Sequence, residues 1–117
     1  MMIEETAPVG TVTDFHLHRG SDEVACVLSG EFTFKIGDVL TVGGPGTCAF
    51  MPRGTAHAWK NTGAEAGRAL FIYTPAEAGK FFEEFKRLQS TATPFDLDEF
   101  KGINQRYGWE TLGPPPF

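Results

Sequence analysis

The sequence predicts an all-β fold, an antiparallel sandwich or barrel, followed by two C-terminal α-helices. Between Thr11 and Tyr73, short apolar runs are interrupted at close intervals by Gly, Pro, Asn or Asp, which is typical of strands joined by tight turns. Apolar and polar residues alternate in Phe32–Ile36, so one face of this strand is predicted to be buried. After Tyr73 the apolar residues recur at helical spacing instead.

The composition is that of one globular domain. The chain has 117 residues, of which 41% are apolar and 21% are charged, and this length suits a single core. The net charge of −5 argues against nucleic acid, because phosphate binding needs clustered Lys and Arg. The first residues are acidic where a signal peptide would be basic, and no apolar run approaches the roughly 18 residues of a membrane span. We therefore expect a cytoplasmic protein that binds a small molecule, with no nucleic-acid or membrane partner.

The barrel and the helices are predicted to occupy successive parts of the chain. We expect about seven strands in the barrel of residues 1–73. Residues 74–117 should form a helical extension and a proline-rich tail packed on the same domain. The two cysteines, Cys26 and Cys48, lie in apolar runs without CxxC spacing, so they are predicted to be buried thiols in strands.

The first helix is predicted to begin at Thr74-Pro75-Ala76-Glu77. Thr74 would be its N-cap, Pro75 would take the first helical position, and Glu77 would complete a capping box. One face of this helix is strongly apolar and should pack on the barrel or on a partner subunit, through Phe81, Phe82, Phe85 and Leu88.

A second helix is predicted between two further signals. Asp96 and Glu99 can cap each other at its start, and Gly108 can end it. Leu97, Phe100 and Ile103 would face inward. The proline cluster of residues 113–117 cannot continue a helix, so we expect an extended arm there.

The three histidines of the chain form the strongest candidate site. His16 and His18 are two residues apart, so in a strand their side chains point to the same face. Glu23 follows after a turn and can return on a neighbouring strand, and His57 lies in another strand-like segment. An isolated His-x-His is more often a surface or hydrogen-bonded pair. Three imidazoles and one carboxylate, however, would suit a divalent iron, manganese, cobalt, nickel, copper or zinc ion.

Two longer patterns around these histidines resemble the sequence motifs of the cupin superfamily. The first is Gly10, five residues, His16-Leu17-His18, four residues, Glu23, six residues and Gly30. The second is Gly46, five residues, Pro52-Arg53-Gly54, two residues, His57, three residues and Asn61, and fifteen residues separate the two. The motifs cover residues 10 to 61 without a departure at a defining position. This resemblance implies a small jelly-roll barrel, the cupin double-stranded β-helix.

The resemblance also implies roles for individual residues. His16, His18, Glu23 and His57 would bind one divalent transition metal. Asp22 is a competing carboxylate that we expect instead at the turn. Gly30, Gly46 and Gly54 are interpreted as turn glycines, Pro52 as a rigid turn former and Asn61 as a structural residue.

A substrate pocket next to the metal should be lined by apolar side chains. Trp59 lies two residues after His57 and should share its inward face, and Phe34 and Phe50 are further candidates, with Phe32 and Met51. Core packing is an equally good interpretation of each. Few polar side chains are expected inside, so the implied substrate is apolar or aromatic.

The second half of the chain resembles the tail of bacterial cupins described as quercetin-dioxygenase-like. The segments are "YTPAEAGKFFEEF", "FDLDEF" and "RYGWETLGPPP". This resemblance implies a dioxygenase for a flavonol-like or enolisable dicarbonyl molecule, in which Glu23 is both metal ligand and proton acceptor. A non-redox isomerase or decarboxylase and a non-catalytic ligand-binding cupin are the alternatives. We interpret the tail itself as a subgroup marker without a chemical role.

The short segment before the first motif predicts a homodimer. Related single-domain cupins usually have extra strands there, whereas nine residues precede Gly10. A sheet edge would then lie open, and open edges need covering. We expect residues 1–9 or the proline-rich tail to cover the neighbour's sheet, unless the start of the chain is truncated.

Overall fold

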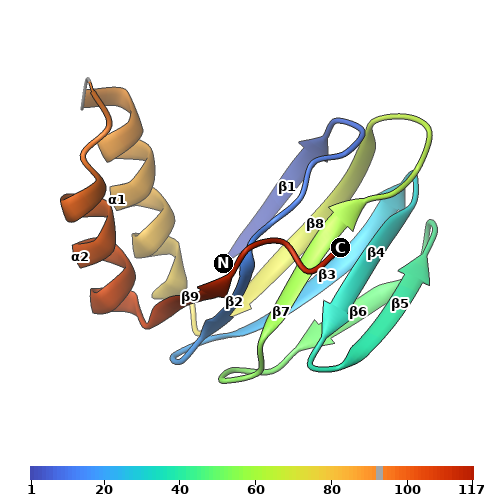
Figure 1. The fold of residues 1–117 in the computed structure, drawn as a ribbon, viewed down its shortest axis with the longest axis horizontal. Coiled ribbons are helices and arrows are strands. Elements are labelled where there is room, and N and C mark those ends of the chain that lie inside the picture. Colours follow the sequence, from blue (N-terminus) through green and yellow to red (C-terminus); the bar gives the residue numbers. More distant parts are fainter. Residues whose placement is uncertain (92–93) are drawn as a thin grey trace.

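The fold is a sandwich of two antiparallel sheets with a pair of helices at one side (Figure 1). A computed structural model describes residues 1–91 and 94–117. One sheet has the strand order β1-β8-β3-β6 and the other has the order β5-β4-β7-β2-β9. The strands are β1 (Met2–Ala7), β2 (Phe15–His18), β3 (Asp22–Ser29), β4 (Phe32–Ile36), β5 (Val39–Gly43), β6 (Cys48–Met51), β7 (His57–Asn61), β8 (Gly67–Thr74) and β9 (Trp109–Gly113).

The predicted fold class is confirmed. Seven strands, β2 to β8, lie between residues 15 and 74, in agreement with the turn spacing. The apolar core lies between the two sheets, and Phe32, Phe34 and Met51 within it are fully buried. In β3 and β8 the buried side chains come from alternate positions of the strand.

The turn glycines and Asn61 have the structural roles that the sequence predicted. Gly30 has a φ of +83°, and a Cβ there would lie 2.8 Å from the Cα of Gly67, so a larger residue would strain the turn and also collide. Asn61 is buried, and its Nδ2 donates to the carbonyl oxygens of Ala7 and Glu65. Its Oδ1 accepts from the backbone N–H of Gly63, so one amide ties three segments together.

The first helix begins later than the sequence predicted. Helix α1 spans Ala78–Thr91, whereas Thr74 is the last residue of β8 and Pro75 lies outside the helix. The reason is that the β8 ladder continues to its end, where Thr74 is paired with Asp22 of β3. The expected N-cap at Thr74 is therefore wrong.

The second helix agrees with the prediction at both ends. Helix α2 spans Leu97–Tyr107, and the Oδ1 of Asp96 accepts from the N–H of Glu99 over 3.0 Å. Gly108 ends the helix in the left-handed conformation, with a φ of +71°. Ile103 is buried as expected, but Leu97 is 56% exposed, which corrects its predicted inward orientation.

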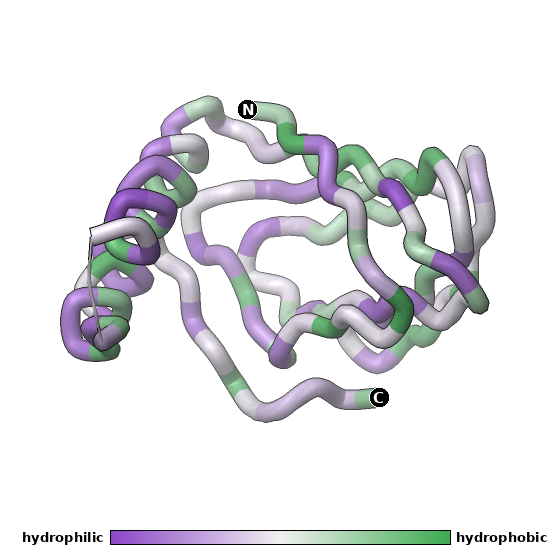
Figure 2. Tube along the Cα trace, turned by 90° about the horizontal axis from the view of Figure 1, so that it is seen from above, coloured by the Kyte–Doolittle hydropathy of each residue, from purple (hydrophilic) through white to green (hydrophobic). Residues whose placement is uncertain are grey.

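The two helices pack on each other through an aromatic cluster that also contacts the sandwich. Phe81, Leu88 and Ile103 are its buried members, and Phe85 and Phe100 pack against them. Trp109, the first residue of β9, stacks on Phe81 with ring centroids 3.8 Å apart. Both views place the helix pair beside one end of the sandwich (Figure 2). Within the described residues, neither helix is long and apolar enough to cross a membrane.

The two outermost segments of the chain form strands that the sequence did not predict. Residues 2–7 are β1, which pairs with β8 of the same chain along its full length. Residues 109–113 are β9, which pairs with β2 and so joins the sheet that carries all three histidines. In this structure the N-terminal segment therefore covers an edge of its own sheet.

The cysteines are not buried as predicted. Cys26 of β3 is half-buried and Cys48 of β6 is exposed, and both lie on the outer face of the first sheet. The alternation of β3 explains this orientation, because its inward positions are Glu23, Ala25 and Val27.

Candidate metal centre

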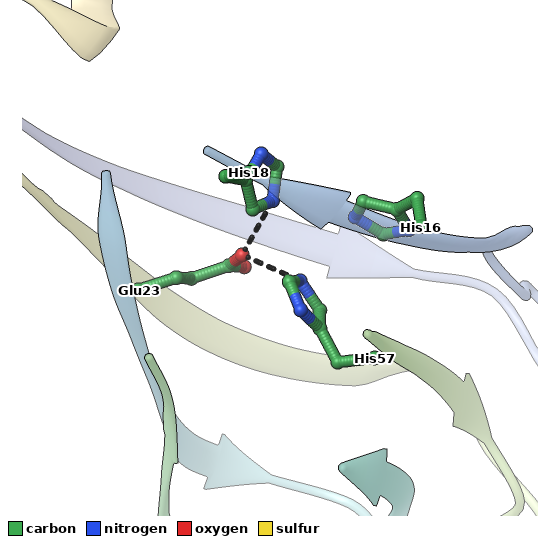
Figure 3. Close-up of side chains that lie close together, drawn as sticks. All are labelled: His16, His18, Glu23 and His57. Carbon is green, nitrogen blue, oxygen red and sulfur yellow. Dashed lines mark hydrogen bonds and ion pairs between the residues drawn. The ribbon is translucent and has the colours of Figure 1, made fainter. Parts of the chain in front are cut away.

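Three strands bring the four predicted ligands together inside the sandwich (Figure 3). His16 and His18 come from β2, Glu23 from β3 and His57 from β7. One ligand atom of each residue lies within 4.8 Å of those of the other three. His16 and His57 are direct cross-strand partners, so the backbone register itself places their rings side by side.

Backbone carbonyls fix the orientation of two of the rings. The Nδ1 of His16 donates to the carbonyl oxygen of Asp14 over 2.7 Å, and the Nδ1 of His57 donates to that of Thr55 over 3.0 Å. Since a carbonyl can only accept, each neutral ring carries its proton on Nδ1. The lone pair of each ring is then on Nε2, as in histidines that bind metals.

Without a cation, lone pairs of the histidine rings would face lone pairs of the Glu23 carboxylate. The Nε2 of His57 lies 3.1 Å from Oε2 of Glu23, and the Nε2 of His18 lies 3.0 Å from the same oxygen. Neither ring nitrogen of His18 makes a hydrogen bond within the described part of the chain, although its side chain is 1% exposed. Buried polar atoms of this kind need a partner. A divalent transition ion bound by the four side chains would supply that partner, so the residues fit the group.

The surroundings of His16, His18 and Glu23 favour two neutral rings and a charged carboxylate, the protonation states that metal binding requires. Burial lowers the pKa of His16 to about 4, and it lowers the pKa of His18 as well. Burial alone would raise the pKa of Glu23, but the contacts with His18 and His57 outweigh it and bring that pKa to about 2.

Tyr73 contacts the centre, and sequence reasoning missed it. Its hydroxyl donates to Oε1 of Glu23 over 3.0 Å, and both side chains are buried. Burial and the Glu23 charge raise the pKa of Tyr73 well above its usual value, so the hydroxyl keeps its proton. Tyr73 and Glu23 are paired across β8 and β3. Tyr73 occupies an inward position in the alternation of β8, and this position could have indicated the contact.

Trp109 is the second residue that the sequence analysis did not assign to the site. Its ring meets that of His18 edge to face, with centroids 3.9 Å apart, and stacks on Phe81 on its other side. The indole therefore separates a metal-ligand candidate from the helix pair. The tail, interpreted from sequence as a marker without a chemical role, supplies a wall of the site.

A cavity of about 360 Å³ opens onto the centre from the helix side. His16 and Glu23 line it, together with Trp59, Tyr73, Phe81, Phe82, Phe85, Phe100 and Trp109. The lining also has polar members, among them Glu5, Asp14, Asn104, Glu110 and Thr111. Most of the aromatic wall comes from α1, α2 and β9.

The three residues predicted to line the pocket lie in different places. Trp59 lines the cavity, as its shared parity with His57 required. Phe34 is fully buried in the core between the sheets, beyond the described cavity lining. Phe50 is 55% exposed and lies on the outer face of β6, which corrects its predicted position. Of the other two candidates, Phe32 and Met51 are fully buried in the same core as Phe34.

The arginines near the motifs are held at the rim of the barrel. Arg53 pairs with Asp22 through its backbone N–H and its guanidinium group. Arg19 pairs with Glu110 of β9. Asp22 thus joins the turns of the two motifs and lies outside the ligand cluster, in agreement with the prediction.

A family model described as "Cupin domain" matches residues 3–73, more than half of the chain. The chain belongs to the cupin family. The cupin region includes all four ligand candidates and ends where the helices begin. The chain matches no curated protein at a significant level.

Solved structures with the cupin fold resemble the chain over about two thirds of its length. A Thermus thermophilus protein is 30% identical, with a TM-score of 0.59 over 63% of this chain and 72% of its own. A Thermotoga maritima protein described as a predicted oxalate decarboxylase is 25% identical, with a TM-score of 0.60 over 62% of this chain and 64% of its own. A putative sugar phosphate isomerase from Acidithiobacillus ferrooxidans is 28% identical, with a TM-score of 0.57 over 62% of this chain and 47% of its own.

Proposed function

We propose that this cupin is a metal-dependent dioxygenase that acts on a flavonol-like or enolisable dicarbonyl small molecule. The observation that supports this proposal best is the aromatic cavity beside the four ligand candidates. Its volume of about 360 Å³ suits a molecule of one to a few rings. Several aromatic side chains in its lining, among them Phe81 and Trp109, could contact a planar substrate.

The charge of the cavity favours a neutral substrate over an anionic one. Four carboxylates line it, namely Glu5, Asp14, Glu23 and Glu110. No Lys or Arg lines it among the residues that the structure describes. Phosphate and carboxylate groups are usually bound by Arg or Lys, so a sugar phosphate or a dicarboxylate would lack that partner here. A phenol or an enol meets no such difficulty.

A divalent iron, manganese, nickel, cobalt, copper or zinc ion held by His16, His18, Glu23 and His57 would supply Lewis acidity and, for the redox-active metals, electron exchange with dioxygen. The aromatic side chains that line the cavity would orient the substrate beside the metal. The helix pair contributes Phe81, Phe82, Phe85 and Phe100 to the lining of the cavity.

Two carboxylates are candidates for the proton acceptor. Glu23 is the one that the family resemblance implies, but both of its oxygens are engaged and its pKa of about 2 makes it a weak base. Glu5 of β1 lines the same cavity and is about half-buried, and burial together with the Glu23 charge raises its pKa. Turnover of Glu23→Gln and Glu5→Gln at saturating metal distinguishes them. The acceptor is the residue whose amide variant loses turnover while its metal content is retained.

Elemental analysis of untagged protein, followed by oxygen-electrode assays with flavonols and diketones, tests the proposal. We expect a redox-active metal and oxygen consumption that requires both substrate and metal. The His57→Ala variant is the matched control, since it lacks one ligand and should consume no oxygen. A protein that carries only zinc and consumes no oxygen with any of these substrates would contradict the proposal.

A non-redox isomerase or decarboxylase is the second candidate. The Thermotoga structure is described as a predicted oxalate decarboxylase and the Acidithiobacillus structure as a putative sugar phosphate isomerase, and both descriptions favour this candidate. Each description concerns that protein alone. Conversion of a carbonyl or carboxylate substrate without oxygen uptake would support this candidate. Ligand binding without any turnover would favour a non-catalytic cupin.

We also propose that the cupin is a cytoplasmic homodimer. β5 is an edge strand whose Val39, Leu40 and Val42 are 64%, 59% and 62% exposed, and an apolar unpaired edge is suited to a partner. Size-exclusion chromatography with light scattering should give twice the chain mass. A monomer mass would contradict the dimer.

A further inference from the structure

The two cysteines of the chain face each other on the outer surface of the first sheet. Cys26 of β3 and Cys48 of β6 are direct cross-strand partners, and their Sγ atoms are 2.7 Å apart. Cys48 is exposed and Cys26 is half-buried, so small reagents can reach the pair. Glu23 and Met51, their neighbours along the same ladder, point to the inside of the sandwich. The cysteine pair is therefore separate from the metal centre.

The ladder geometry of the pair suits a covalent bond. The N–H of Val27 donates to the carbonyl oxygen of Thr47 over 2.8 Å, one step along the strands from the cysteines. In antiparallel sheets hydrogen-bonded and non-hydrogen-bonded pairs alternate, so Cys26 and Cys48 occupy a non-hydrogen-bonded pair. The Cα atoms of such a pair are about 4.5 Å apart, within the range that a disulfide spans. No backbone rearrangement is needed for the sulfur atoms to meet.

We propose that Cys26 and Cys48 are a reversible oxidation site. Low-molecular-weight disulfides such as oxidised glutathione oxidise the two thiols to an intramolecular disulfide. The thiolate of Cys48 attacks one sulfur of the reagent, and the first glutathione leaves as a thiolate. The thiolate of Cys26 then attacks Sγ of Cys48 and expels the second glutathione. Two protein thiols are oxidised, one disulfide is reduced to two thiols, and no other oxidant takes part.

The order of attack follows from exposure. Cys48 is the more accessible thiol, whereas the hydrogen bond to Cys48, with partial burial, raises the pKa of Cys26. Cys26 is then in contact with the mixed disulfide at Cys48 and resolves it.

Closure of the bond should stabilise the fold. It joins the edge strand β6 to β3 and closes the loop that contains the β4–β5 hairpin. Loop closure of this length restricts the unfolded chain, so we expect the melting temperature to rise on the order of 10 °C.

Titration of the native protein with oxidised glutathione, read by thiol counting and by intact mass under non-reducing conditions, tests the proposal. We expect both thiols to disappear together, a mass decrease of about 2 Da and full reversal by dithiothreitol. Cys26→Ser is the matched control, because it removes the resolving thiol and leaves the exposed Cys48, and it should instead gain a single glutathione, about 305 Da. Glutathione adducts that persist on the wild-type protein, a disulfide between two chains, or two thiols that remain reduced would each overturn the proposal. Equal melting temperatures of the oxidised and reduced forms would overturn the stabilising effect.

Discussion

Replacement of Tyr73 by Phe should weaken metal binding while leaving the ligands in place. The change removes one hydroxyl, which donates to Oε1 of Glu23 over 3.0 Å. Tyr73 is 6% exposed and Glu23 is 2% exposed, so no bulk water replaces the lost donor. A hydrogen bond to a charged group contributes about 1.5–3 kcal/mol, and the loss of a partner that supports a metal ligand typically costs about 10–100-fold in affinity. We expect the loss of metal affinity to fall in that range.

The second tyrosine of the chain provides a matched control. Tyr107 of α2 also lies beside a carboxylate, Glu84, which raises the pKa of that hydroxyl, but it lies outside the described cavity lining. Metal affinity is measured by competition with a chelating dye, and the free energy of unfolding by urea titration of the metal-free proteins. Tyr107→Phe should bind metal like the wild type, whereas Tyr73→Phe should show reduced affinity and reduced stability.

Two results would refute this reasoning. Metal affinity of Tyr73→Phe within about twofold of the wild type would mean that the hydrogen bond does not support Glu23 as a ligand. An equal loss in Tyr107→Phe would mean that the effect comes from general destabilisation of the aromatic cluster.

Three further predictions concern the same centre and its surroundings. His57→Ala should lower metal affinity by at least about 100-fold yet leave a cooperative unfolding transition, measured by circular dichroism, because the apolar core is separate from the ligands; loss of the fold would contradict this. The metal-free protein should lose stability as the pH falls from 6.5 towards 4, because burial lowers the pKa of His16 to about 4 and the unfolded chain then binds more protons. Glu23, with its pKa lowered from 4.5 to about 2, adds a loss of the same sign at lower pH, and urea midpoints independent of pH would contradict both. Asn61→Ala should lower the free energy of unfolding by about 2–4 kcal/mol, because it leaves buried backbone groups without hydrogen-bond partners. The metal affinity of this variant, measured at a pH where it is folded, should stay unchanged.

The ligand cluster could be predicted because it depends on local rules and on a recognisable pattern. Strand parity alone places His16 and His18 on one face, and the motif spacing adds Glu23 and His57. The structure brings these four side chains together as the pattern implies. The cap of α2 was also predictable, since Asp96 and Gly108 act within a few residues of the helix ends.

The remaining walls of the site could not be predicted because they depend on pairing between distant segments. Trp109 reaches His18 only because β9 pairs with β2, about ninety residues away, and no local pattern specifies that partner. Phe50 was misplaced because Cys48–Met51 is apolar at every position, so the sequence shows no alternation from which to decide which residues face inward. The start of α1 was misplaced because Thr74 satisfies the rules for a cap and for a strand end alike.

The strand that carries two of the histidines is only weakly joined to the rest of its sheet. Between β2 and β7 the described ladder has one residue pair, His16 with His57, whereas β3 and β8 are paired at seven positions. An ion bound by both rings would link β2 to β7, where the backbone ladder provides the fewest residue pairs. Amide hydrogen exchange in β2 and β9 should therefore slow markedly when metal is added, while the amides of β3, already protected by its long ladders, should change little.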